Sequence, residues 1–253
     1  MHNAVRAVRV GGEKLAKFLR LSSSAVGVRF LADGEQPDGA MVLKQHRYCQ
    51  ALMRARRGES VLLKGESIAC PAAAAAFGFR PLPGGLQTGK GLVGFGIVAD
   101  EAVGRRMFEA MPRLEPGQIQ SLHLFPLDRA EHVPDVVVVE DEVEKLMWIA
   151  LAYLHATGGE RVQSSTAVLQ ATCVDSTIVP YLENRLNLGY GCYGCRDATD
   201  LGANETVLGF PASMLPPIVE HVEHLAHRAI PTSRSKKAWA ALQSKGPEQG
   251  DMD

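Results

Sequence analysis

Hydrophobic residues in the first half of the chain follow strand-like and helix-like spacings in turn. Val26, Val28 and Phe30 alternate with other residues over 25–31, which predicts a strand with these three side chains on one face. The same reasoning predicts strands at 60–64 and 92–98 and helices at 13–19, 44–56, 71–76 and 101–111. The glycine-rich stretch 81–91 is expected to form a loop.

The second half shows a similar order of patterns. Strands are predicted at 136–139, 167–169 and 205–211, and helices at 143–156, between Cys173 and Leu182, and at 216–228. In each half, a strand, a helix that stops at glycine, a strand, a cysteine, a short helix, a glycine-rich loop, a strand and a helix follow one another.

This order predicts an α/β (α+β) fold, with one globular unit built from two similar strand-helix-strand-helix halves. The globular domain is expected over 12–230, with halves of about 12–115 and 116–230, between an N-terminal extension over 1–11 and a flexible tail over 231–253. An internal duplication would explain the repeated order, but α/β proteins also repeat such orders by chance.

Composition places the chain among globular proteins. Its 253 residues are 46% hydrophobic and 22% charged, and the net charge of −1 argues against nucleic acid as a partner. The longest weakly polar stretch, 146–154, is too short for a membrane span, and the N-terminus lacks a secretory hydrophobic region. We therefore expect a soluble, cytoplasmic protein with a small-molecule substrate or a redox partner protein, and a homo-oligomer is compatible with the sequence.

The strongest chemical motif is Cys192-x-x-Cys195, framed by Gly191 and Gly194. Two thiolates at this spacing can reach one metal, and glycine lets the backbone between them turn toward the sulfurs. A redox dithiol and a pair of unligated thiols are the alternatives. Five cysteines in a chain without an export signal favour metal ligands or reduced thiols over disulfides.

The other cysteines extend this motif into a site. Cys70 and Cys173 occupy matching places in the two predicted halves, so we expect Cys70, Cys173, Cys192 and Cys195 to bind one cofactor. A 4Fe-4S iron–sulfur cluster is favoured because these cysteines are dispersed on glycine- and alanine-rich backbone; zinc, which four thiolates also suit, is the alternative. Cys49 is then a thiol beside the cluster, or a ligand in place of Cys173.

Outside the predicted ligands, Cys49, His46 and Arg196 are the candidate catalytic residues, because each lies on or beside a cysteine segment. The motif His221-x-x-His224-x-x-His227 is more simply a solvated helix face than a metal site. A basic patch of Arg54, Arg56 and Arg57 is also expected to be solvated, with an anionic substrate or partner protein as the alternative.

These motifs together resemble the bacterial and archaeal domain-of-unknown-function family numbered one hundred and sixty-nine. The resemblance extends over about residues 12–229 and is carried by residues 25–30, 48–52, 55–58, 68–71, 77–79, 173, 191–196 and 209–211. It implies that the cysteines belong to the family's pattern, and it supplies no reaction. The expected function is a redox or sulfur-related iron–sulfur protein, such as an iron–sulfur-dependent oxidoreductase or lyase; the alternative is a non-catalytic accessory protein with a structural zinc or thiol site.

Overall fold

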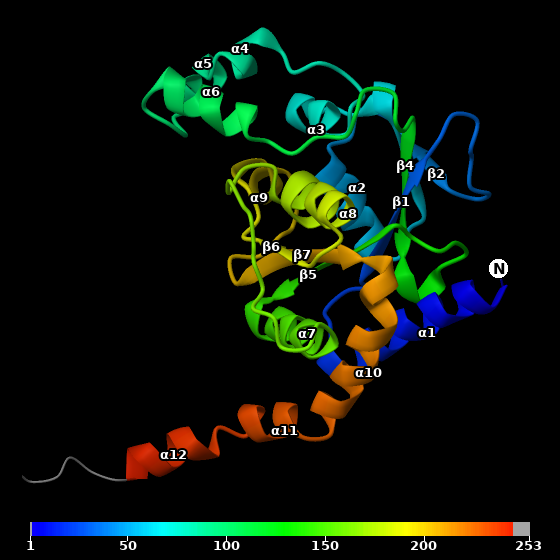
Figure 1. The fold of residues 1–253 in the computed structure, drawn as a ribbon, viewed down its shortest axis with the longest axis vertical. Coiled ribbons are helices and arrows are strands. Elements are labelled where there is room, and N and C mark those ends of the chain that lie inside the picture. Colours follow the sequence, from blue (N-terminus) through cyan, green and yellow to red (C-terminus); the bar gives the residue numbers. More distant parts are fainter. Residues whose placement is uncertain (1, 245–253) are drawn as a thin grey trace, which may run out of the picture.

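One mixed seven-stranded sheet runs through the computed structural model, which describes residues 2–244 (Figure 1). Across the sheet lie β2 (Met41–Leu43), β3 (Val61–Lys64), β4 (Ser121–Pro126), β1 (Val26–Leu31), β5 (Val136–Glu142), β7 (Glu205–Pro211) and β6 (Asn187–Gly189). Neighbouring strands are antiparallel, except for the parallel pair β2 and β3. Because β1 pairs with both β4 and β5, the two halves of the chain share one continuous sheet.

Helices cover both faces of this sheet, which explains the unbroken valine run in β5. Val136 and Val138 belong to one hydrophobic core, whereas Val137 and Val139 belong to the other, as alternation along a strand requires. The second core is built with α1 (His2–Leu19), α7 (Val143–Ala156) and α10 (Leu215–Ala226). The first is built with α2 (Tyr48–Arg56), α3 (Pro71–Ala76) and α8 (Val179–Glu183), on the opposite face in Figure 1.

The N-terminal helix α1 is longer than the helix predicted at 13–19. It begins at His2 and therefore includes residues 2–11, where Val8 is already buried. Gly11 and Gly12 let the helix approach its neighbours: a Cβ on Gly12 would lie 2.6 Å from the backbone nitrogen of Asp128. The predicted boundary near residue 12 thus falls inside one packed helix.

The prediction of a strand at 92–98 is wrong, and so is the prediction that residues 81–91 form a loop without helices. The segment forms two short helices, α4 (Gly84–Gln87) and α5 (Lys90–Gly94), which are followed by α6 (Glu101–Glu109). Leu92 is buried while Phe95 is 64% exposed, so the apolar residues here do not line a strand face. Gly89 instead permits close helix packing, because a Cβ there would overlap the carbonyl oxygen of Glu101 in α6.

The predicted strand at 167–169 is also absent. Val168 and Gln170 have left-handed backbone conformations (φ +58° and +55°), and the chain then enters η3, an eight-residue π-helix (Ala171–Ile178) that continues into α8. Cys173 therefore lies inside a helix, whereas Cys70 precedes one as the N-cap of α3. The strands predicted at 92–98 and 167–169, on which the repeated order depended, are both missing. The structure therefore does not show the internal duplication.

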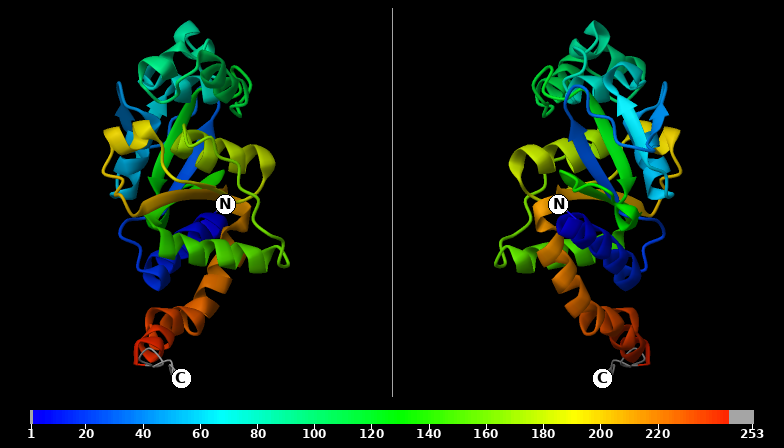
Figure 2. Two further views of the ribbon diagram at one scale, coloured as in Figure 1. Left: turned by 90° about the vertical axis from the view of Figure 1, so that its left-hand side faces the viewer. Right: turned by 90° about the vertical axis from the view of Figure 1, so that its right-hand side faces the viewer.

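The chain beyond α10 is helical where it was expected to be a flexible tail. It forms α11 (Ala229–Arg234) and α12 (Lys237–Ser244), which extend away from the sheet at the end opposite α4–α6 (Figure 2). Arg234 binds Glu144 at 2.9 Å and so ties α11 to α7. The remaining predicted tail, residues 245–253, lies outside the described residues. Over the described chain, none of the helices is long and apolar enough to cross a membrane.

Candidate functional site

All five cysteines are free thiols, and four separate segments bring them into the same hydrophobic core. Cys49 lies on α2, Cys70 caps α3, Cys173 lies in η3, and Cys192 and Cys195 lie at the start of α9 (Tyr193–Ala198). Four of them are buried, and Cys70 is half-buried. The sheet thus gathers cysteines that are widely separated in sequence.

The pair Cys192 and Cys195 is in direct contact, with 3.0 Å between the sulfurs. Cys192 is the N-cap of α9, and its sulfur accepts the backbone N–H of Cys195 at 3.3 Å. The backbone N–H of Ala171, at the start of η3, also bonds this sulfur. Gly191 has a left-handed backbone (φ +77°), which turns the chain into the motif as its glycine frame predicted.

The remaining thiols surround this pair. Cys195 is hydrogen-bonded to Cys49, and the Thr172 hydroxyl lies 3.1 Å from the Cys195 sulfur. Cys173 donates a weak hydrogen bond to the backbone carbonyl of Gln170 at 3.6 Å. It is also close enough to Cys70, Cys195 and Cys192 that a negative charge on any of them would disfavour its ionisation.

Burial and mutual proximity favour the protonated forms of Cys173, Cys192 and Cys195. Burial, followed by the neighbouring cysteines, raises the pKa of Cys173 well above its ordinary value. The contact with Cys195 and burial likewise raise the pKa of Cys192. For Cys195, the bond from Cys192 lowers the pKa, but Cys49 and burial outweigh it and raise the value to about 11. Because the thiolate is the nucleophile of disulfide exchange, this environment is unlike that of an efficient redox dithiol.

The geometry of the sulfurs bears on metal binding. Within residues 2–244, no set of three or more cysteine, histidine, aspartate or glutamate side chains is arranged to hold a metal ion. The 3.0 Å between Cys192 and Cys195 is shorter than the roughly 3.8 Å between two sulfurs that each lie 2.3 Å from one tetrahedral metal. Binding would therefore require the thiol side chains to rotate outward while the backbone stays in place.

His46 and Arg196 hold the cysteine segments in position. The backbone of His46 pairs with the segment before Cys70, accepting the N–H of Ala69 at 3.0 Å, and its ring bonds the carbonyl of Lys44 at 2.7 Å. The Arg196 guanidinium donates to the backbone carbonyls of Tyr190 at 2.6 Å, Gly202 at 2.8 Å and Glu205 at 3.0 Å. Both residues therefore support the site through backbone contacts.

A buried ion network beside the site was not predicted. Arg56, expected on a solvated face, is only 6% exposed because it lies 2.6 Å from Asp200 and 3.5 Å from Glu140. Burial raises the pKa of Glu140 to about 7 despite the opposing charge of Arg56. The Thr172 hydroxyl, which lies 3.1 Å from the Cys195 sulfur, is near enough to Glu140 to lower its pKa, so this network adjoins the cysteine cluster. The basic patch around Arg56 was recognised in the sequence, but the carboxylates that pair with Arg56 were not.

A cavity of about 380 Å³ lies on another side of η3, between this helix and α6. Its buried polar residues are Gln170 and Asp175, and burial raises the pKa of Asp175 to about 7. Sequence reasoning missed the cavity, because it assigned 167–169 to a strand and so gave Gln170 no place in a site.

Fold and site together define a single-sheet protein with α and β elements and a buried cluster of free cysteines between its helices. Residues 14–221 match the domain-of-unknown-function family one hundred and sixty-nine, which is described as "Uncharacterised ArCR". The chain belongs to this family, as its cysteine motifs indicated.

A relative from Methanocaldococcus jannaschii, "Uncharacterized protein MJ0308", is 30% identical over 224 residues. The match covers 87% of the chain and 95% of the relative, so the likeness extends over nearly the full length of both. No solved structure gives a significant match to the chain.

Proposed function

We propose that the cysteine cluster binds an iron–sulfur cluster of the 4Fe-4S type, with Cys70, Cys173, Cys192 and Cys195 as its ligands, in a cytoplasmic protein with a redox or sulfur-related role. The observation that carries this proposal is the convergence of every cysteine of the chain into one core. A lone buried cysteine usually serves as a small hydrophobic residue. Five that come from four segments and contact or electrostatically affect one another require a more specific explanation.

The surroundings of the sulfurs suit this cofactor. The backbone N–H groups of Cys195 and Ala171 already point at the Cys192 sulfur, and such bonds stabilise thiolates in iron–sulfur sites. The alanines of α3, which follow Cys70, are small buried side chains that pack in the same core. Binding of the cluster would deprotonate the thiols, so their raised pKa values make its affinity depend on pH.

When bound, an iron–sulfur cluster with four cysteine ligands supplies electron transfer, and one with three leaves an iron position for substrate. Burial of the thiols excludes water from the site. Cys70 is the most accessible of the five thiols, and so marks the side from which a redox partner protein or small-molecule substrate would approach.

A structural zinc site in a non-catalytic accessory protein is the second candidate. It is favoured by one observation: Cys192 and Cys195 would need to separate by only about 0.8 Å to bind the same metal. The choice between the two cofactors therefore depends on metal analysis.

The test is anaerobic purification of the full chain with measurement of iron, acid-labile sulfide, zinc and the absorption spectrum. We expect about four irons and four sulfides per chain and a broad absorption near ~400 nm that is lost in air. Single Cys→Ser variants at each of the five cysteines identify the ligands, and Cys49→Ser against Cys173→Ser decides which of the two is spare. Ala75→Ser is the matched control, because it places the same hydroxyl in the same core without removing a thiol.

Loss of iron in the ligand variants but not in Ala75→Ser would support the proposal. Stoichiometric zinc without iron would overturn it in favour of the second candidate. Five titratable thiols without any metal would overturn both.

A further inference from the structure

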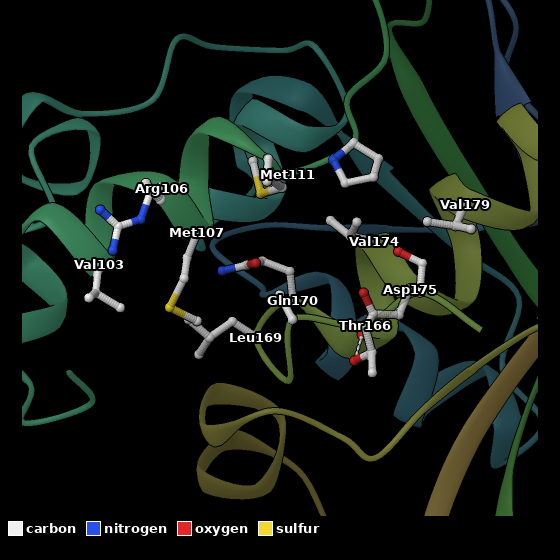
Figure 3. Close-up of a pocket in the computed structure, with 14 residues that line it drawn as sticks. Val103, Arg106, Met107, Met111, Thr166, Leu169, Gln170, Val174, Asp175 and Val179 are labelled. Carbon is white, nitrogen blue, oxygen red and sulfur yellow. Dashed lines mark hydrogen bonds between the residues drawn. The ribbon is translucent and has the colours of Figure 1, made fainter. Parts of the chain in front are cut away.

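The cavity between α6 and η3 adjoins the cysteine cluster, because Asp175 in its wall interacts electrostatically with Cys173 and Cys192. Its walls come from one side of α6 and the residues after it, from the segment before η3, and from the face of η3 and α8 that carries Val174, Asp175 and Val179 (Figure 3). No cysteine lines it. Its volume of about 380 Å³ lies at the lower end of the range for small-molecule sites, so it suits a small metabolite.

Two buried polar side chains in this cavity have atoms without a protein partner. Gln170 is 9% exposed and Asp175 is 3% exposed. Asp175 accepts the Thr166 hydroxyl through Oδ2 at 2.5 Å, but within the described chain nothing donates to its Oδ1 or bonds the side-chain amide of Gln170. Neither side chain has an atom among the fully buried polar atoms that lack a partner, so these atoms are open to solvent from the cavity, where a ligand can form hydrogen bonds with them.

The backbone at the wall of the cavity supports a binding role. Val168 and Gln170 both have left-handed conformations, which are unfavourable for residues other than glycine and most of all for β-branched valine. Such strain persists where the surrounding structure enforces it, and it is concentrated at binding sites. Here it directs the Gln170 side chain into the cavity (Figure 3).

The remaining walls are mostly apolar. Met107, Met111, Leu169 and Val174 line the middle, and Arg106 on α6 is exposed at the edge. Figure 3 shows Arg106 and the Gln170 amide on one side of the cavity and Asp175 on the other. The site therefore offers hydrogen-bond donors at one end, an acceptor at the other and an aliphatic surface between them.

We propose that this cavity binds a small linear carboxylate with an amino or hydroxyl group at its other end. The carboxylate accepts hydrogen bonds from Arg106 and Gln170, and the amino or hydroxyl group donates to Asp175. Residues 170 and 175 are five positions apart, which is one π-helical turn, so both side chains reach the same cavity and one small ligand can bond both. This inference does not depend on the cofactor of the cysteine cluster.

The test is ligand titration of the protein as purified anaerobically, by calorimetry and saturation-transfer NMR. The probes are 5-aminopentanoate, 5-hydroxypentanoate, pentanoate and pentylamine. We expect the first or second probe to bind about tenfold more tightly than pentanoate and pentylamine, each of which lacks one polar end. The amino and hydroxyl probes distinguish the two ligand types, and metal content measured on the same samples keeps this result separate from the cofactor proposal.

Variants at the edge of the cavity test its location without disturbing the core. Arg106→Gln should weaken binding of the bifunctional probes about tenfold, whereas Arg105→Gln, on the same helix but not in the cavity wall, should leave it unchanged. Val103→Trp should block the cavity, and Val133→Trp, at a similarly exposed position elsewhere, should not. Failure of the folded wild-type protein to bind any probe, or binding that both Arg106→Gln and Val103→Trp leave intact, would overturn the proposal.

Discussion

Gly209 is the position at which the sheet most tightly constrains the π-helix. It lies in β7 with its Cα directed at η3, and a Cβ there would overlap the carbonyl oxygen of Ser176 and lie 2.7 Å from its carbonyl carbon. Both groups are backbone, so no side-chain rotation can relieve the overlap. The nearest of these atoms, the Ser176 oxygen, would lie 1.8 Å away. Gly209→Ala should therefore push η3 away from the sheet by about 1.5 Å to restore an ordinary carbon–oxygen contact.

The size of the effect follows from two opposing contributions. Overpacking of this kind costs about 1–3 kcal/mol, and the upper end applies because the displaced group is a buried helix backbone. Alanine also reduces the conformational freedom of the unfolded chain, which returns about 0.4–1 kcal/mol. We expect a net loss of about 2 kcal/mol in the free energy of unfolding, or a fall in Tm of about 4–8 °C for a chain of this length.

Urea denaturation followed by circular dichroism measures this loss. Gly189→Ala should cost less, because its Cβ would lie 3.3 Å from the side-chain carbons of Ala171 and Asp175. Gly85→Ala is the control, since a Cβ there meets open space in the short helix α4, and its stability should stay within about 0.5 kcal/mol of wild type. If Gly209→Ala is as stable as Gly85→Ala, then β7 and η3 are not packed as closely as described.

Two further predictions concern buried polar groups. Burial, followed by the charges of His132 and Arg29, lowers the pKa of His123 from 6.5 to about 4. Between these pH values the unfolded chain binds a proton at His123 that the folded chain does not bind. The free energy of unfolding should therefore fall by up to about 3 kcal/mol as the pH falls from 6.5 to 4. His123→Gln should flatten this part of the stability profile in pH-dependent urea denaturation, and an unchanged slope would contradict the assignment. Tyr48→Phe removes a buried hydrogen bond of 2.8 Å to Thr177 and should lower the unfolding free energy by about 1 kcal/mol. Because Thr177 keeps its bond to the carbonyl of Thr172, a loss above ~3 kcal/mol would instead indicate a repacked core.

Elements with a regular hydrophobic period could be predicted from the sequence. The valine run at 136–139 corresponds to β5, because a strand buried on both faces is continuously hydrophobic. The amphipathic segment 143–156 corresponds to α7, because a helix buried on one face repeats hydrophobic residues every three to four positions. The segments 92–98 and 167–169 were assigned wrongly. Their short apolar runs resemble strands locally, but tertiary packing against α6 and η3 determines their backbone.

For the candidate site, residue type was more informative than position. A shared cysteine site could be predicted from the Cys192-x-x-Cys195 motif and the presence of three further cysteines. The places assigned to Cys70 and Cys173 are not equivalent in the structure, because one caps a helix and the other lies inside one. The contribution of Thr172, which lies near both Cys195 and Glu140, could not be predicted. It depends on the turn of a π-helix, for which the sequence has no recognisable period.

The pairing of β1 with β5 joins the two halves of the chain, and the cysteine site needs residues from both halves. Cys49 and Cys70 are made more than 100 residues before Cys173, and the three later cysteines reach them only after β5, β6 and β7 have joined the strands of the first half. A fragment that ends before Cys192 therefore lacks the Cys192–Cys195 pair. A cofactor that needs this pair can bind only after most of the chain has been made.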